Sequence, residues 1–240
     1  MKQSKRQKQP KQLKRPKRLK QNRNHTLHYN QEYSPKENVT LPVLTQDGPV
    51  ITSYLDRAFK VFDKALDAHS KVLVVRFDLK VPAQISLPEN AGGNGVIRLF
   101  LDSLEAKIEA NLHRKGSPHK CPVRYIIARE IGDKNQGLHY HVMLLLNGHA
   151  FRHIGVIESE KDNPFWLIVG AWASALKTTD EEAVDGVQFG FNRKGVRQYY
   201  LDPSLDYHLL PDAFRRSSYL CKAHTKHFGE GHHGLMTSRK

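Results

Sequence analysis

Apolar and polar positions follow two different periods along this chain, and each period predicts one kind of element. Apolar residues recur at helical spacing over 51–66 and 97–112, with polar and charged residues between them. Apolar runs at 72–79 and 139–146 predict strands, and the segment 123–130 is also strand-like. The unbroken apolar start of the first run favours a central position in a sheet.

Later segments complete the order of elements. The segment 163–176 opens with Asn-Pro, a capping residue and a first-turn proline, so it predicts an apolar helix. Short strands are expected at 187–191 and 196–201 across an Asn-Arg-Lys-Gly turn, and a last helix over about 211–225. From residue 72 the order is strand, helix, strand, strand, helix, strand, which is the ferredoxin-like (RRM-like) α+β order. We therefore expect an antiparallel sheet with helices on one face and a site on the other.

The net charge of +14 is concentrated at the start of the 240-residue chain. Residues 1–23 hold eleven Lys and Arg and no acid, which leaves 27 basic and 24 acidic side chains for the rest. We interpret residues 1–38 as a basic disordered tail, followed by one folded domain over 39–235. The tail favours binding to a polyanion, and nucleic acid fits best because the tail lacks the apolar anchors needed for a membrane surface.

Cysteine usage and hydropathy give further expectations. Cys121 and Cys221 provide neither a disulfide framework nor a zinc-ribbon pair, which fits a reducing compartment. The basic N-terminus is not followed by the apolar core of a signal peptide, and the chain has no apolar run of about 18 residues. We expect a soluble, cytoplasmic protein.

The strand 139–146 begins with two histidines one residue apart, His139 and His141. Because side chains alternate along a strand, both imidazoles point to the same face, which is the geometry of a two-histidine metal site. If Glu130 on the preceding strand pairs with His139, then Ala128 pairs with His141 and the carboxylate shares that face. A register shift of one residue would turn Glu130 to the other face. A chance pair of structural histidines is the competing interpretation.

The last predicted helix, 211–225, carries a tyrosine among cations. At helical spacing Arg215, Arg216 and Lys222 lie on the same side as Tyr219. Positive charge favours tyrosinate and binds phosphate, as a tyrosine nucleophile attacking DNA requires, and Arg215 and Arg216 are candidate DNA contacts. An ordinary amphipathic tyrosine on a basic helix is the competing interpretation.

Other histidines offer weaker sites. His149 and His153 follow the strand 139–146 as loop residues, and either is a candidate partner to a metal ligand. A separate C-terminal metal site is conceivable from four histidines in a Gly-rich segment, which we rank as solvated side chains: His224, His227, His232 and His233.

In combination these motifs resemble the HUH endonucleases, specifically the phage and prophage rolling-circle replication initiators of the inovirus replication protein, or YagK/YfjJ, type. The resemblance rests on His-hydrophobic-His at 139–141, on Glu130 nine positions before it and on Tyr-x-x-Lys at 219–222. The residues 75–79, Val-Arg-Phe-Asp-Leu, resemble the weaker first motif of that superfamily. The similarity covers about residues 45–230, and its short motifs are informative mainly together and in this order.

The resemblance implies a metal-dependent, site-specific nicking and rejoining of single-stranded DNA. Glu130, His139 and His141 would hold one Mg²⁺ or Mn²⁺, and Tyr219 would attack the scissile phosphate, leaving a 5′-phosphotyrosine and a free 3′-hydroxyl. Lys222 would hold the phosphate or assist deprotonation of the tyrosine. The implied partners are single-stranded DNA at a replication origin and a host helicase and polymerase, and no membrane.

Two departures from that pattern matter. Some initiators carry paired tyrosines on one helix, whereas this helix has only Tyr219, and Tyr199 and Tyr200 lie upstream. The chain also has no Walker A motif, so a separate helicase would have to open the duplex. The alternative function is that of a non-catalytic DNA- or RNA-binding prophage regulator on the same scaffold.

Overall fold

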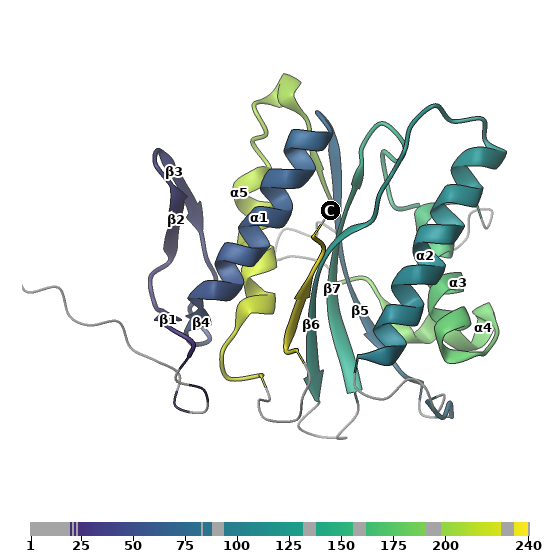
Figure 1. The fold of residues 1–240 in the computed structure, drawn as a ribbon, viewed down its shortest axis with the longest axis horizontal. Coiled ribbons are helices and arrows are strands. Elements are labelled where there is room, and N and C mark those ends of the chain that lie inside the picture. The colour runs from purple at the N-terminus through teal and green to yellow at the C-terminus, as the bar shows by residue number, and fades with distance from the viewer. Residues whose placement is uncertain are drawn as a thin grey trace, which may run out of the picture.

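The computed structural model describes residues 20, 22, 24–82, 84–87, 94–131, 138–155, 162–190, 198–226 and 233–239. The chain is a mixed α+β protein with antiparallel sheets and, in this described part, five α-helices. The main sheet has the order β10–β6–β7–β5–β8, and β9 also pairs with β5 (Figure 1). Its strands are β5 (Val72–Lys80), β6 (Arg124–Ile131), β7 (Leu138–Asn147), β8 (Val187–Gln188), β9 (Gln198–Leu201) and β10 (Leu235–Thr237).

The centre of the sheet is the long antiparallel pair of β5 and β7. Their register runs from Val72 opposite Asn147 to Lys80 opposite His139. The first four residues of β5, 72–75, are completely buried. The predicted central position of this strand is therefore confirmed.

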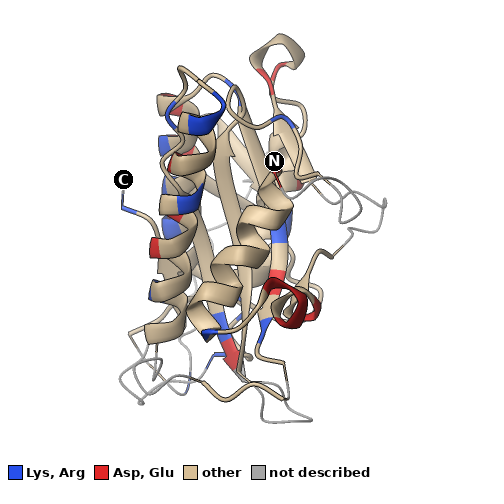
Figure 2. Ribbon diagram, turned by 90° about the vertical axis from the view of Figure 1, so that its right-hand side faces the viewer, with Lys and Arg blue, Asp and Glu red and all other residues tan. Residues whose placement is uncertain are grey.

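One face of the sheet is covered by α2 (Gly95–Arg114) and α3 (Pro164–Leu176). The odd-numbered residues of β5, from Leu73 to Leu79, pack in this core. Asn163 caps α3 as predicted, because its side chain accepts a hydrogen bond from the Trp166 N–H. Figure 2 shows α3 almost without charged residues, α2 with both signs of charge on its outer side, and the short acidic α4 (Asp180–Ala183).

The opposite face is covered in part by α1 (Thr52–Ala68) and α5 (Leu210–Ser218), so the prediction of helices on one face only was wrong. Val72 and Val74 of β5 pack against these helices. The even-numbered positions become polar from Arg76 onward. Burial under α1 and α5 removes the apolar side chains of this face from water. The polar positions from Arg76 onward form the candidate site.

The N-terminal boundary of the folded part lies earlier than predicted. β1 (Leu27–His28) pairs with β4 (Val50–Ile51), and β2 (Glu32–Lys36) forms a hairpin with β3 (Val39–Pro42). Tyr33 on β2 is buried and stacks on Phe214 of α5 with ring centroids 5.9 Å apart. The expected tail over 1–38 is therefore too long, and residues 1–19 lie outside the described residues.

The last predicted helix, 211–225, is shorter than expected. α5 ends at Ser218, and a 3-10 helix over Tyr219–Cys221 follows it. The backbone of Lys222 is extended and forms an isolated bridge with Val50, and this pairing turns the chain away from the helix axis. Tyr219 therefore sits at the end of the helix and not within it.

The two short strands predicted at 187–191 and 196–201 both pair with the same side of β5, one after the other. β8 pairs with Asp78 and Leu79, and β9 pairs with 72–75 of the same strand β5. The Asn-Arg-Lys-Gly turn expected between them lies outside the described residues. In the described part of the chain, no helix combines the length and apolarity that a membrane crossing needs.

Candidate metal and tyrosine site

The pairing of β6 with β7 brings the predicted metal ligands together. Glu130 lies opposite His139, and Ala128 lies opposite His141, which is the register that the prediction required. All three candidate ligands therefore project from the same face of the sheet, beyond the apolar residues that α1 covers. Glu130 and His141 are buried, whereas His139 is half-buried.

The ligand atoms of Glu130, His139 and His141 lie within 4.8 Å of one another. Glu130 Oε2 is 3.0 Å from His141 Nε2 and 3.9 Å from His139 Nε2. The predicted cluster is thus formed by one carboxylate oxygen that faces two imidazole nitrogens.

Asp78 on β5 fixes the orientation of His141. The Nδ1–H of His141 donates to Asp78 Oδ1 at 2.6 Å, and Arg76 Nη2 lies 3.1 Å from the same oxygen. Burial alone would raise the pKa of Asp78, but the hydrogen bond from His141 and the Arg76 charge lower it. A carboxylate behind the imidazole holds the ring so that Nε2 points at Glu130, which is the arrangement of a metal-binding histidine.

His141 is held between two carboxylates. Burial disfavours its imidazolium form, yet the hydrogen bonds with Asp78 and Glu130 raise its pKa above the ordinary value. A metal at Nε2 would take the place of the proton shared with Glu130.

The second oxygen of Glu130 has its own partners. Lys226 Nζ donates to Oε1 at 2.9 Å, and the Thr225 hydroxyl donates to it at 2.7 Å. The Lys226 side chain is fully buried. Burial alone would raise the pKa of Glu130. The hydrogen bond from His141 and the positive charge of Lys226 instead hold this pKa well below its usual range. Glu130 is therefore an anion with one oxygen occupied and the other directed at the histidines.

These residues fit a divalent cation. The donor set is one carboxylate oxygen and two imidazole nitrogens, with His141 supported from behind by Asp78. The carboxylate suits Mn²⁺ and Mg²⁺, and the imidazoles suit transition metals such as Fe²⁺ or Zn²⁺. The donor set therefore does not fix the ion.

Tyr219 lies next to this cluster. Its ring centroid is 5.4 Å from that of His141, with the two planes nearly perpendicular. Lys222 Nζ is 3.6 Å from the centroid of the tyrosine ring, and Arg76 Cζ is 5.2 Å from it. Tyr219 is half-buried between these two cations.

The cations near Tyr219 include one that was not predicted, Arg76. Arg216 is buried, and its guanidinium donates to the backbone carbonyl of Gly190. Arg215 is half-buried one turn earlier in α5. Both arginines precede the tyrosine at helical spacing, by four and three residues, and Arg76 from β5 is an additional cation beside it.

Among the residues that the structure describes, no other histidine joins the group of candidate ligands. His149 Nε2 lies 3.0 Å from the hydroxyl oxygen of Ser70, beyond the far end of β7 from His139. His153 and His224 are exposed. Two of the C-terminal histidines considered as a separate site, His227 and His232, lie outside the described residues.

Comparison with known proteins assigns the chain to a family. Residues 34–237 match the YagK/YfjJ C-terminal domain. The chain belongs to this family. A YagK/YfjJ protein of Escherichia coli K12, the uncharacterized protein YagK, is 33% identical over 195 residues, covering 77% of this chain and 91% of YagK. The uncharacterized protein YfjJ from the same organism is 28% identical over 205 residues, covering 80% of this chain and 96% of YfjJ. No solved structure matches the chain.

Several residues around the candidate site were not singled out as site residues from the sequence. Lys226 and Thr225 reach Glu130 from a segment 95 and more residues away, and no local pattern marks them. Arg76 and Asp78 carried a signal, because polar residues interrupt an otherwise apolar strand at alternate positions.

Proposed function

We propose that this protein is a metal-dependent, HUH-type endonuclease that nicks and rejoins single-stranded DNA through Tyr219. The observation that carries the proposal is the contact of Tyr219 with His141, at the edge of the Glu130–His139–His141 group. A candidate nucleophile and a candidate metal site from distant parts of the chain share one face of the sheet. Structural histidines alone give no reason for this arrangement.

The topology supports the same proposal. The strands β6, β7, β5 and β8 are neighbours in that order, all pairs are antiparallel, and α2 and α3 pack on one face. This is the arrangement expected of a ferredoxin-like, split βαβ scaffold. We infer an HUH-type scaffold that carries two added helices, α1 and α5, on the face of the site.

The residues around Tyr219 suit phosphoryl transfer. The Tyr219 hydroxyl loses its proton and attacks the phosphorus, the bond from phosphorus to the 3′-oxygen breaks, and that oxygen takes up a proton. A bound divalent cation would polarise the scissile phosphate. Arg76 and Lys222 place positive charge beside the tyrosine, where it would stabilise the negative charge of the transition state.

The biological role that we propose is the start of rolling-circle replication of a phage or prophage element. The free 3′-hydroxyl would prime a host polymerase after a host helicase has opened the duplex, in the bacterial cytoplasm. A later attack by a 3′-hydroxyl on the phosphotyrosine would close the circle.

The test is a nicking assay on a diverse pool of single-stranded DNA with Mn²⁺ or Mg²⁺. We expect a covalent protein–DNA adduct that requires the metal and disappears in Tyr219→Phe. Tyr200→Phe is the matched control, because its hydroxyl bonds to the Gly148 carbonyl at the other end of β5. Tight DNA binding by the wild type with no adduct would reject the enzyme and favour the non-catalytic DNA- or RNA-binding regulator.

A further inference from the structure

The loop at 43–49, between β3 and β4, lies along residues 218–223, which we call the tyrosine segment. At the start of this segment, the Leu44 N–H donates to the Ser218 hydroxyl oxygen at 2.9 Å. Ser218 is completely buried, so water does not compete for this hydrogen bond. The loop therefore fixes the residue that directly precedes Tyr219.

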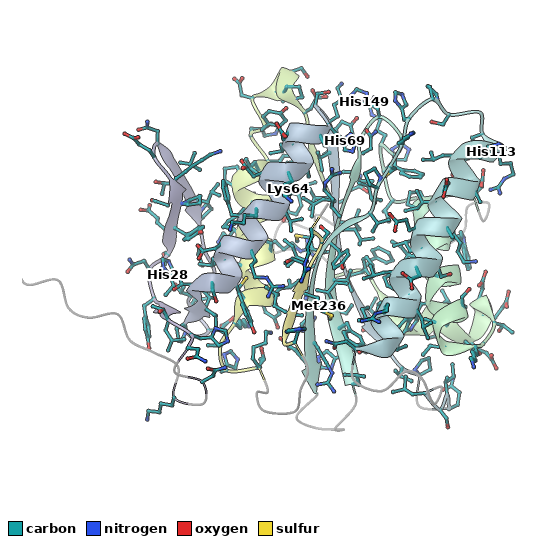
Figure 3. The ribbon with its side chains drawn as sticks, in the orientation of Figure 1. His28, Lys64, His69, His113, His149 and Met236 are labelled. Atoms are coloured by element: carbon teal, nitrogen blue, oxygen red, sulfur yellow. The ribbon has the colours of Figure 1, made fainter. Side chains whose placement is uncertain are left out.

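Two backbone contacts hold the other end of the tyrosine segment. The Ala223 N–H donates to the Pro49 carbonyl at 3.1 Å, and Val50 forms a bridge with Lys222. Val50 belongs to β4, which lies beside the tyrosine segment and pairs with β1. His28 on β1 is labelled on this side of the molecule in Figure 3. The tyrosine segment is thus held at both ends by the part of the chain that precedes α1.

Asp47, in the same loop, contacts a side chain of the candidate site. Its Oδ2 is 3.4 Å from Lys222 Nζ, and that ammonium nitrogen is 3.6 Å from the centroid of the Tyr219 ring. The Lys222 side chain is 8% exposed, whereas that of Asp47 is 60% exposed. A buried ammonium group is costly without an anionic partner. The Asp47 carboxylate is such a partner, and it favours the position of the ammonium on the face of the ring.

We propose that Asp47 is a positioning residue, which acts through Lys222 to hold the tyrosine nucleophile in place. This role rests on the proposed attack of Tyr219 on DNA. The backbone contacts of the 43–49 loop fix the tyrosine segment, and the Asp47 carboxylate fixes the cation that lies on the tyrosine ring. Such control matters for the rate, because a displacement of about 1 Å in a reacting group can slow a reaction about 100-fold.

The opposite role for Asp47 would be inhibition of the site. An exposed carboxylate near Tyr219 repels the phosphates of DNA and competes with them for Lys222. An inhibitory ion pair would draw the ammonium away from the tyrosine. Here Lys222 Nζ contacts Asp47 and the Tyr219 ring together, at 3.4 Å and 3.6 Å, which favours positioning. The two roles predict opposite changes in rate when the carboxylate is removed.

The first measurement is the rate of covalent adduct formation by the full chain, with Mn²⁺ and a saturating oligonucleotide that contains the nick site found in the pool assay. We expect Asp47→Asn to slow adduct formation about tenfold, because Lys222 loses the group that holds it. Its affinity for the same oligonucleotide, measured by fluorescence anisotropy without metal, should be unchanged or tighter, because a negative charge is removed. A loop that had merely lost its structure would weaken both.

Matched variants test whether the effect belongs to Asp47 and runs through Lys222. Asp63→Asn is the control, because Asp63 pairs with Lys36 at 2.9 Å and both side chains are more than half exposed. It should form the adduct at the wild-type rate. Asp47→Glu keeps the carboxylate and should restore the rate to within about threefold of the wild type. Asp47→Asn should add nothing to the loss caused by Lys222→Met.

A second measurement reports on the tyrosine ring and needs no nicking. In protein labelled with fluorotyrosine, the fluorine resonance of Tyr219 is the one that is absent from Tyr219→Phe. This resonance should shift in Asp47→Asn, because the cation on the ring has lost its partner. It should keep its position in Asp63→Asn.

Several results would overturn the role of Asp47. These are an unshifted Tyr219 resonance or an unchanged rate in Asp47→Asn. Faster adduct formation by Asp47→Asn would make the ion pair inhibitory, and an equal loss in Asp63→Asn would assign the effect to net charge. Absence of an adduct in the wild type would instead reject the proposed nicking, and the fluorine resonance would still test whether Asp47 positions the ring.

Discussion

The two carboxylate oxygens of Glu130 have different partners. Oε1 accepts hydrogen bonds from Lys226 and Thr225, whereas Oε2 faces the two histidines. A buried carboxylate without a cationic partner is strongly unfavourable, so Lys226 keeps Glu130 charged and in one orientation when no metal is bound. A metal ion bound at Oε2 and the Lys226 ammonium group would then be two cations that share one buried anion.

Lys226→Met is expected to destabilise the metal-free protein and to increase the stabilisation that Mn²⁺ gives. The Lys226 side chain is fully buried on Glu130, so its loss should cost about 3 kcal/mol of unfolding free energy, at the lower end for a broken buried pair because His141 still donates to Glu130. A bound cation would restore the missing positive charge. Thermal unfolding with and without Mn²⁺ measures both effects.

Lys222→Met provides the matched control for that variant. Lys222 is also a buried lysine, but its ion pair is with the exposed Asp47 at 3.4 Å. Its loss should leave the rise in unfolding temperature on adding Mn²⁺ as it is in the wild type. If Lys226→Met and Lys222→Met respond equally to Mn²⁺, Lys226 and the metal do not share Glu130.

His139 is the candidate ligand whose removal best separates metal binding from stability. Its side chain is 21% exposed, whereas that of His141 is 8% exposed. His139→Ala should therefore change the free energy of unfolding by less than about 1 kcal/mol. It should weaken Mn²⁺ binding by more than about 100-fold, because it removes one of three ligands. Electron paramagnetic resonance of free Mn²⁺ measures the affinity, and His149→Ala should leave it unchanged. An unchanged affinity in His139→Ala would mean that the ion binds elsewhere.

At the scale of elements, the strands of the site were the most predictable part of the fold. The two histidines at alternate positions of an apolar run, and Glu130 nine residues earlier, gave both the hairpin and its register. That success has a physical basis, because a shift by one residue would bury His139 and expose its apolar neighbours. The apolar stripes of α1 and α2 were equally informative.

The rest of the site depended on contacts that local patterns do not encode. The residues 219–225 look helical, but the bridge from Lys222 to Val50 ends the helix and places Tyr219 beside Arg76. The polar segment that contains β2 has low apolar content, yet it folds because Tyr33 stacks on Phe214. In both cases a partner more than 100 residues away decides the local structure.

The end of β5 beside the site is held by close packing around Gly186. A Cβ at this position would lie 2.5 Å from the Lys80 carbonyl oxygen, which also accepts a hydrogen bond from the Trp172 indole. Gly186→Ala should therefore destabilise the protein by about 1 to 3 kcal/mol. Gly170→Ala, inside α3, meets only ordinary contacts at 3.5 Å and should stabilise it by up to about 1 kcal/mol. Denaturant unfolding of both variants gives the comparison, and a Gly186→Ala protein as stable as the wild type would contradict this packing.

For the whole molecule, the sheet face that carries the site is divided into two halves. The apolar half, with Val72, Val74, Met143 and Leu145, is buried under α1 and α5. The polar half carries the candidate metal ligands of β6 and β7, together with Arg76 and Asp78 of β5. The helices α1 and α5 therefore stabilise the sheet and border the candidate site, and the end of α5 places Tyr219 beside it.

The charge of the whole chain is divided as unevenly as this face. Residues 1–23 contribute eleven of the net fourteen positive charges, so the remaining residues carry a net charge of only +3. A phosphate backbone bound by that segment would release counterions, whereas recognition at the metal site would involve few charges. Removal of the basic segment should therefore weaken the affinity for DNA without changing the candidate metal site.

Deleting residues 1–19, which hold nine Lys and Arg, tests that separation. We expect weaker binding to single-stranded DNA and a flatter dependence of log affinity on log salt, because the slope scales with the number of phosphates neutralised. The unfolding temperature should stay the same, since the packed β1 and β2 strands begin at Leu27. A full-length variant with these nine residues changed to Gln controls for chain length and should behave like the deletion. If both variants kept the wild-type salt slope, the folded domain would supply the phosphate contacts, and the cations near Tyr219 would have to account for them.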